Sequence, residues 1–466
     1  MSTSGNFSAS TSTSFSTGKG FAPIVLLLII AILIVFFLGS FFSKISLFPK
    51  FSPLSPDRTS APKSGVFVEK IKGSKFHSPD ATWWGYNQSK IVRFKNKVFT
   101  YYIDNDDDSN KTTSKFVILK KDGDGGWEQG AMFPTSRPGN LLIDSKGVLH
   151  AFVFEPFVET NDSIGRIMHY YFPNSASGDV KNYKQEMVVD NDGKTETANI
   201  RVGTAIGADD TMAISFGLTK FNPAYKEQSE HIYYKKPDEE KWNHTFTDGL
   251  AHDYFYPFTL VSGNTFYLLP IQDDFTGQNN PNIYQKIMFM QYSNGIWKNE
   301  VIVDLSTHPL AKSKPRLLEQ EDLYEDKNGN IHIIYKEFLD EKNQYTPTAH
   351  WHVSGKPGNW KSAQINLEKP GVNWVRLVEV DGELYYLITT FGEVFISPIE
   401  NVKLTKIDIP EDAKNNYPYV ATSKGGSTQS EFVDVLLLGA DRKLFEEGQI
   451  TNYYVRIPKE QFAHLK

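Results

Sequence analysis

Residues 141–154 read LLIDSKGVLHAFVF, and this stretch decides the fold. A short apolar run leads into the polar turn Asp144-Ser-Lys-Gly147, and a second run rich in β-branched and aromatic residues follows. The glycine supplies the positive φ angle that a tight hairpin needs. The stretch therefore predicts two antiparallel strands joined by a short turn.

This hairpin is one of seven similar units that lie between Gly85 and the C-terminus. The second run of each unit begins 49 to 66 residues after the previous one, near Lys97, Val148, Thr211, Thr265, Ile331, Leu384 and Val433. A period of about fifty residues with several strands in each unit is typical of propeller blades. The sequence predicts an all-β fold, a seven-bladed β-propeller over residues 66–466.

The last unit contains only three strand-like runs, at residues 417–421, 432–438 and 452–457. A blade needs four strands, and an open ring would leave sheet edges exposed. The run Val66-Phe-Val-Glu-Lys-Ile71 lies before the first unit. We expect it to complete the last blade and close the ring.

Four of the eight tryptophans occupy the same place, directly after the turn of an outer hairpin. They are Trp127, Trp242, Trp297 and Trp360. One large aromatic ring per blade at a fixed position is best explained by packing between neighbouring sheets. We interpret these tryptophans as structural.

The hairpin KKDGDGGW that ends at Trp127 resembles the Asp box, Ser-x-Asp-x-Gly-x-Thr-Trp, with Asp122 and Trp127 at matching positions. On this basis residues 66–466 resemble the BNR-repeat, sialidase-like propellers. That resemblance implies glycans without naming a reaction, because the family includes sialidases, other glycosidases, polysaccharide lyases and binding domains. The family's Arg-Ile-Pro motif lies near the start of its propeller, whereas Arg456-Ile-Pro458 lies at the end here. No sialidase role is therefore assigned to Arg456.

Composition removes several classes of function. A net charge of -6 argues against a nucleic-acid partner, and the absence of cysteine excludes disulfides and thiolate metal sites. No cofactor-binding or metalloprotease motif is present, and the acidic run Asp104–Ser109 lacks the glycine of a calcium loop. We expect no cofactor and no metal.

The N-terminal part differs from the rest of the chain. Residues 1–20 are rich in Ser, Thr and Gly and predict a disordered tail, whereas residues 43–65 contain four prolines and predict a stalk. Between them, Phe21 to Phe42 is a run of 22 residues without a charge. A helix of that length crosses the roughly 30 Å hydrocarbon core of a bilayer, so we expect a single transmembrane helix.

The orientation of this helix has two interpretations. Lys19 precedes the span, whereas Lys44, Lys50 and Arg58 follow it, which by the positive-inside rule places the propeller in the cytoplasm. Large domains can translocate despite such charges, and the layout of anchor, stalk and propeller favours a propeller outside the cell membrane. Four sequons matter only if the source glycosylates, and they begin at Asn87, Asn110, Asn161 and Asn243.

Candidate binding residues lie in the segments that enter the innermost strands, because these segments open at one mouth of the central channel. The ring so formed is rich in Arg, His and aromatic residues. Its predicted ligand-binding members are Arg137, Arg201, His252, Tyr254, Tyr256, Glu321, Trp374 and Arg376. Arginines hold carboxylates or sulfates through paired hydrogen bonds, and aromatic faces stack on sugar rings.

Three functions remain open from the sequence. The first is an extracellular binding module that recognises a glycan, acidic in character, or a protein at the channel mouth. The second is a glycan-active enzyme, with His and Tyr as base and acid of a lyase, or Glu321 with Asp80 in a hydrolase. The third is a structural surface protein. Whether the chain is an enzyme is undecided, because no placed acid–base pair can be identified from the sequence.

Overall fold

The fold was analysed in a computed structural model. It describes residues 65–71, 87, 89–104, 114–135, 137–158, 161–190, 202–218, 228–274, 282–342, 346–390, 392–410, 419–422, 424–426, 431–439 and 451–465. These residues lie in one compact unit, Pro56–Lys466. The predicted tail, the predicted span Phe21–Phe42 and most of the predicted stalk lie outside the described residues.

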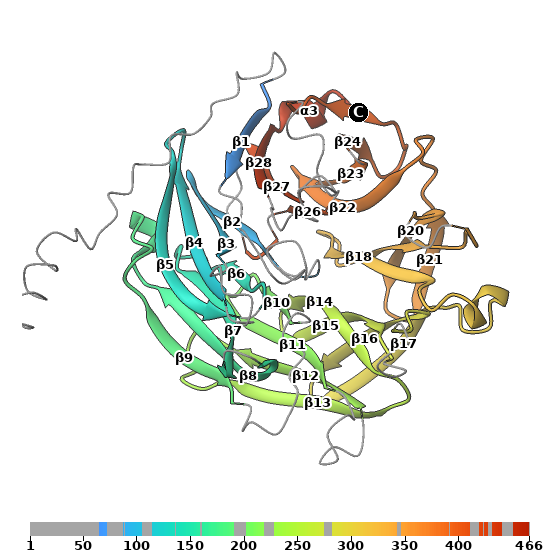
Figure 1. Cartoon of the computed structure of the whole chain (residues 1–466), viewed down its shortest axis with the longest axis horizontal. Coiled ribbons are helices and arrows are strands. Elements are labelled where there is room, and N and C mark those ends of the chain that lie inside the picture. Colours follow the sequence, from blue (N-terminus) through green and yellow to red (C-terminus); the bar gives the residue numbers. More distant parts are fainter. Residues whose placement is uncertain are drawn as a thin grey trace, which may run out of the picture. The chain divides into compact units, whose positions relative to one another are not determined.

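Seven four-stranded antiparallel sheets are arranged around a common centre (Figure 1). Blade 1 contains β2 (Ile91–Phe94), β3 (Lys97–Asp104), β4 (Ser114–Asp122) and β5 (Trp127–Thr135). Blade 2 contains β6 (Asn140–Ile143), β7 (Leu149–Val158), β8 (Asn161–Phe172) and β9 (Lys184–Val189). Blade 3 contains β10 (Gly203–Ile206), β11 (Met212–Leu218), β12 (Gln228–Lys235) and β13 (Asn243–Leu250).

Blade 4 contains β14 (Tyr254–Ser262), β15 (Thr265–Gln272), β16 (Lys286–Ser293) and β17 (Ile296–Asp304). Blade 5 contains β18 (Leu318–Glu325), β19 (Ile331–Glu337), β20 (Ala349–Lys356) and β21 (Asn359–Gln364). Blade 6 contains β22 (Val372–Val380), β23 (Glu383–Thr390), β24 (Glu393–Pro398) and β25 (Thr405–Ile407). Blade 7 contains β26 (Tyr419–Thr422), β27 (Phe432–Gly439), β28 (Thr451–Pro458) and β1 (Phe67–Ile71).

The predicted seven blades and the predicted origin of the last strand are confirmed. β1 pairs antiparallel with β28 from Phe67 opposite Arg456 to Ile71 opposite Asn452. Figure 1 shows the two ends of the propeller's chain side by side, β1 in blue against β28 in red. Three short helical turns complete the described elements: η1 (Ser175–Ser177), η2 (Pro309–Lys312) and α3 (Glu460–Ala463).

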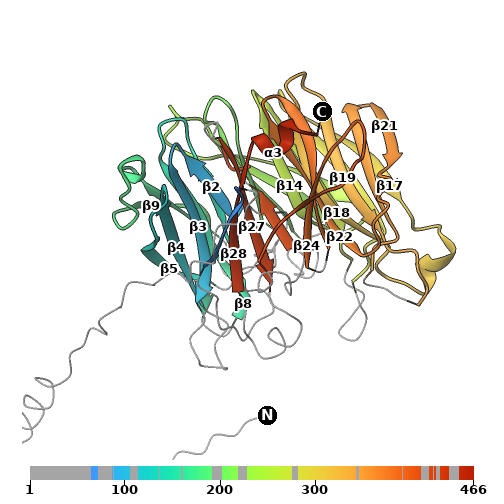
Figure 2. The same cartoon turned by 90° about the horizontal axis from the view of Figure 1, so that it is seen from above.

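Side-chain chemistry in the inner turns explains why the hairpins form where they do. The Asp144 carboxylate accepts hydrogen bonds from the amides of Lys146 and Val148, and Gly147 has a φ of 82°. Asp326 makes the same two contacts with Asn328 and Asn330 in blade 5. Such Asx turns reverse the chain without leaving buried amides unpaired. The strands of each blade then run between the two faces of the propeller (Figure 2).

Hydrophobic clusters lie between neighbouring blades, and the four tryptophans extend them outward, as predicted. Trp242 donates its indole N–H to Glu186 of blade 2 at 3.0 Å, Trp297 donates to Thr245 of blade 3, and Trp360 donates to Glu300 of blade 4. Trp127 packs edge-on against the Tyr454 ring of blade 7. Each tryptophan therefore connects its blade to the preceding one.

Buried ion pairs reinforce the closure between blades 7 and 1. The Lys121 ammonium of β4 lies 2.8 Å from the Glu69 carboxylate of β1, and the two side chains are only 2% and 4% exposed. Arg93 of β2 donates to Asp434 of β27 at 2.7 Å. The Arg93–Asp434 pair joins the two ends of the propeller's chain directly, and the Lys121–Glu69 pair joins blade 1 to β1, the strand that completes blade 7.

Candidate functional site: the central cavity

A short segment of blade 7 crosses the channel beside blade 2. The Ile143 amide of β6 donates to the Gly425 carbonyl at 2.7 Å, and a Cβ at Gly425 would lie 2.3 Å from the Leu141 carbonyl oxygen. A Cβ at Gly426 would lie 2.1 Å from the carbonyl oxygen of Ile143. Only glycine permits so close an approach of two backbones. We call Lys424–Gly426 the plug.

A cavity of about 90 Å³ lies on the axis beside the plug. Its wall comes from the innermost strands, or the residues next to them, of every blade except blade 2, which the plug covers. The polar residues of the wall include Asn87, Ser89, Thr204, Asp322, Arg376 and Lys424. Since a single water needs about 10–15 Å³ of such space, the cavity holds several waters or the polar part of one ligand.

β-Bulges in three consecutive innermost strands shape one side of the channel. The register shifts between Phe255 and Phe258 in β14, between Gln320 and Asp322 in β18, and between Val372 and Trp374 in β22. Tyr256, in the first bulge, has a φ of 54°, which is rare for a residue other than glycine. Bulges re-aim side chains and are frequent beside functional sites.

Arg376 emerges from β22 into this bulged region and is 4% exposed. Its Nε donates to the carbonyl of Val420 in blade 7 at 3.1 Å, and its Nη1 donates to the Glu321 carbonyl in blade 5. The guanidinium also lies 5.0 Å from the Trp374 ring centroid and 5.3 Å from that of Phe258. Backbone carbonyls and aromatic faces therefore hold the cation in place.

Asp322 and Lys424 face each other across the wall as an ion pair. The Asp322 carboxylate also accepts from the amides of Leu323 and Leu377. Burial lowers the pKa of Lys424, and the neighbouring Asp322 charge opposes that shift. With Arg376 added, the described residues of the cavity wall carry two cations and one anion.

Apart from the ion-paired Lys424, three uncharged polar side-chain atoms of the wall have no hydrogen-bond partner within the described part of the chain: Asn87 Oδ1, Ser89 Oγ and Thr204 Oγ1. All three atoms are buried. Asn87 Nδ2 donates to the Pro257 carbonyl at 3.0 Å, so the sequon asparagine is turned inward and is not available for glycosylation in the folded chain. Buried polar atoms are normally satisfied, so three unsatisfied ones at a single cavity indicate a bound group or water.

Glu321, the hydrolase candidate, is fully buried in a separate network. Its carboxylate lies 2.8 Å from His350 Nδ1 and 3.6 Å from Lys336 Nζ, and it accepts from the Val375 amide at 3.2 Å. Trp374 is 2% exposed, with the Lys336 ammonium 3.4 Å from its ring centroid. These residues hold blades 5 and 6 together.

A second group of titratable side chains lies where β14 begins. His252 Nδ1 lies 2.8 Å from Asp274 Oδ2, and the histidine side chain is 33% exposed. The Tyr254 ring meets the His252 ring edge-on, with 6.3 Å between the two ring centroids. Burial, together with the charge of Asp274, raises the pKa of the Tyr254 hydroxyl. Behind it lies Glu230, fully buried, with neither carboxylate oxygen paired in the described part of the structure. Burial raises the pKa of Glu230 well above its usual value.

The structure brings the predicted residues together only in part. Arg376 lines the cavity and His252 is accessible, whereas Arg137 lies at the start of blade 2, apart from the cavity wall, and Arg201 lies outside the described residues. The predicted stacking faces Tyr254, Tyr256 and Trp374 are 5%, 3% and 2% exposed. This corrects the expectation of open aromatic faces, because strand pairing and neighbouring blades cover these rings.

Sequence reasoning missed Asn87, Ser89, Thr204 and Lys424. Asn87 and Ser89 stood out only as part of a sequon, and Thr204 and Lys424 belong to no motif. The four residues meet only because the ring closes. Asp322 could have been found, since it directly follows the predicted Glu321 at a bulge of β18.

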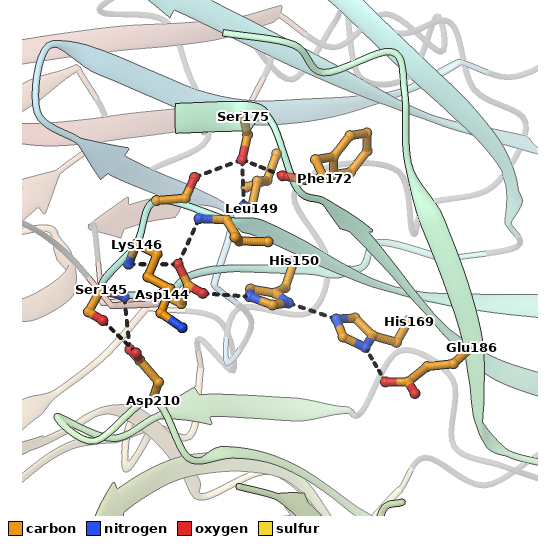
Figure 3. Close-up of polar contacts among 12 residues, drawn as sticks. Asp144, Ser145, Lys146, Leu149, His150, His169, Phe172, Ser175, Glu186 and Asp210 are labelled. Carbon is orange, nitrogen blue, oxygen red and sulfur yellow. Dashed lines mark hydrogen bonds and ion pairs between the residues drawn. The ribbon is translucent and has the colours of Figure 1, made fainter. Parts of the chain in front are cut away.

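Another polar chain proves to be structural. His150 Nδ1 and His169 Nε2 are 2.8 Å apart, His169 Nδ1 lies 2.8 Å from Glu186, and Asp144 lies 3.9 Å beyond His150 (Figure 3). Figure 3 shows the chain running across blade 2 from the inner turn. Glu186 then contacts Lys235 and Trp242 of blade 3. The chain therefore joins two blades.

No group of three or more His, Asp or Glu side chains in the described residues is placed to hold a metal ion. Among the same residues, no helix is both long enough and apolar enough to cross a membrane.

Comparison with known proteins supports the fold. No family model matches the sequence, and no curated protein sequence matches it. Among solved structures, the chain is similar to the polysaccharide lyase Uly1, with a TM-score of 0.51 and 11% identity, over 80% of this chain and 90% of that one. The two proteins therefore share a fold.

Two further solved structures are more distant. The α-L-arabinofuranosidase Arb93A of Fusarium graminearum has a TM-score of 0.43 and 13% identity, over 69% of this chain and 93% of that one. The fucose-binding Aleuria aurantia lectin, a six-bladed propeller, has a TM-score of 0.38 and 10% identity, over 71% and 98%. The chain is a seven-bladed propeller, and no family model supports the finer resemblance to BNR-repeat sialidases.

Proposed function

We propose that the propeller binds an acidic glycan, with the acidic group of the sugar in the central cavity. The observation that carries this proposal is that two cationic side chains, Arg376 and Lys424, line one small cavity in the centre of the ring. Charged groups in a poorly solvated site are stabilised by groups of opposite charge, and an anionic ligand would supply such a group. Guanidinium and ammonium groups are also the usual partners of sugar carboxylates and sulfates.

The proposal is tested by titrating the soluble propeller with oligogalacturonate, a heparin oligosaccharide and a neutral malto-oligosaccharide. We expect the acidic sugars to bind and the neutral one to bind poorly. A hydrogen bond to a charged group contributes about 1.5–3 kcal/mol, so Lys424→Gln and Arg376→Lys should each weaken binding by about tenfold or more. Lys361→Gln, at an exposed position of β21, is the matched control. Equal binding of neutral sugars, or binding only to a protein, would contradict the proposal.

A glycan-active enzyme is the second candidate, and the His252–Asp274 pair favours it. A carboxylate that orients a partly exposed histidine is the usual arrangement of a general base, and Tyr254 beside it offers a hydroxyl as acid. Ultraviolet detection of unsaturated products from polyuronates tests the lyase form, and reducing-sugar release tests the hydrolase form. His252→Gln should abolish either activity while leaving the fold intact. If wild type cleaves neither class, the binding module remains.

We further propose that residues 21–42 anchor the propeller in the cell membrane, with the propeller outside. The uncharged run of 22 residues followed by a proline-rich stretch supports this arrangement. Protease added to intact cells should release a propeller fragment into the medium. Release only after permeabilisation would place the propeller in the cytoplasm, as the flanking charges favour.

A further inference from the structure

We propose that the cavity selects a hydroxycarboxylate, the arrangement of a uronic acid, and that Asn87, Ser89 and Thr204 are its specificity-determining residues. This inference rests on the proposed function, because it assumes that the acidic group occupies the cavity. It adds a requirement for ligand hydroxyl groups, which an acidic group by itself would not satisfy.

The orientation of the Asn87 amide is determined by its neighbour. The Pro257 carbonyl can only accept a hydrogen bond, so the group that faces it at 3.0 Å must be the NH₂ of Asn87. The opposite atom, Oδ1, is therefore the one at the cavity, where it is buried without a partner in the described chain. An amide oxygen can only accept. A carboxylate oxygen cannot satisfy it, whereas a ligand hydroxyl can.

Ser89 and Thr204 add two hydroxyls that are similarly unused. The backbone of Ser89 is occupied, since its amide donates to Asn140 Oδ1 and its carbonyl accepts from Leu141. Thr204 is held by the pairing of β10 with β11, opposite Ile214. Neither side-chain oxygen has a partner within the described residues, although both are buried. Rigid backbones thus hold two hydroxyls that can donate to, or accept from, a ligand hydroxyl.

The charged and uncharged groups come from different blades. Arg376, Lys424 and Asp322 belong to blades 6, 7 and 5, whereas Asn87, Ser89 and Thr204 belong to blades 1 and 3. A ligand that satisfies both sets carries an acidic group and, a few bonds away, hydroxyl groups. A uronic acid has this combination on one ring. A buried acceptor left unpaired discriminates strongly against a ligand that lacks the matching hydroxyl.

The test compares three probes of the same ring size by calorimetric titration of the whole propeller. Galacturonate carries the acid and the hydroxyls, cyclohexanecarboxylate carries only the acid, and galactose carries only hydroxyls. We expect galacturonate to bind at least tenfold more tightly than either of the others. A galacturonate trisaccharide is the fourth probe, because tighter binding than the monomer indicates a glycan end, and equal binding indicates a free sugar acid.

The variants Thr204→Val and Ser89→Ala remove one unpaired hydroxyl each and no hydrogen bond within the described chain. Each should weaken galacturonate binding by about tenfold, leave cyclohexanecarboxylate binding unchanged, and leave the unfolding temperature equal or higher. Ser145→Ala, which removes a hydroxyl that donates to Asp210 away from the cavity, is the control and should bind like wild type.

Two outcomes would overturn the inference while sparing the proposed function. One is equal binding of galacturonate and cyclohexanecarboxylate, both weakened by Lys424→Gln. The other is unchanged galacturonate affinity in Thr204→Val and Ser89→Ala, which would mean that water alone occupies these positions. If no acidic probe binds at all, the proposed function fails first.

Discussion

Replacing His169 by glutamine should make the propeller less sensitive to acid. His169 is 2% exposed and is stacked on Phe152, between His150 and Glu186. Burial lowers its pKa from 6.5 to about 4, and the charges of His150 and Lys235 act in the same direction, against Glu186. Between these two pKa values, His169 is protonated in the unfolded chain and neutral in the folded chain. Stability is lost as pH falls from 6.5 towards 4.

The size of the effect follows from these two pKa values. At pH 5 an unfolded histidine is almost fully protonated and the folded one is mostly neutral, so the linked loss of stability relative to pH 7.5 is about 2 kcal/mol. Urea unfolding of wild type and His169→Gln at pH 7.5 and pH 5 measures it. The variant should lose about 2 kcal/mol less than wild type between the two values.

His464→Gln, at an exposed position of the C-terminus, is the control and should keep the full pH dependence. His169→Gln should also keep part of the pH dependence of stability, because burial lowers the pKa of His231 to about 3 and that of His352 to about 4 in other blades. If wild type and His169→Gln lost equal stability on acidification, the histidine chain would not be a neutral inter-blade contact and the reasoning would be refuted.

Two further predictions concern the ring. Lys121→Met leaves the buried Glu69 carboxylate without its cation and should lower the free energy of unfolding, measured in urea, by about 3–5 kcal/mol. The double variant Lys121→Met with Glu69→Leu should be close to wild type in the same measurement. Equal losses in the single and double variants would mean that the ion pair does not close the ring. Gly425→Ala places a Cβ 2.3 Å from the Leu141 carbonyl oxygen and should displace the plug, lowering stability by about 1–3 kcal/mol and weakening galacturonate binding. Gly126→Ala, where a Cβ meets no atom within 4 Å, is the control and should spare both.

The sequence determined the architecture because each blade is a local unit. Alternating apolar residues, Asp and Gly in the turns and one tryptophan per outer hairpin are signals that neighbouring residues carry. The missing strand of the last unit was also predictable, since a ring cannot leave an edge open and Val66–Ile71 was the available run. For the same reason, the structural role of the four tryptophans followed from their repeated position.

Only the tertiary structure decided the site. Arg376 was predicted because it lies in a segment that enters an innermost strand, but its partners Val420 and Glu321 lie in other blades. The cavity joins Asn87, Thr204 and Lys424, whose separation along the chain exceeds any local pattern. The aromatic residues chosen as stacking faces are covered by strands that pair across the fold. Which polar atoms lack a partner depends on every neighbour, and those neighbours are set by the closure of the ring.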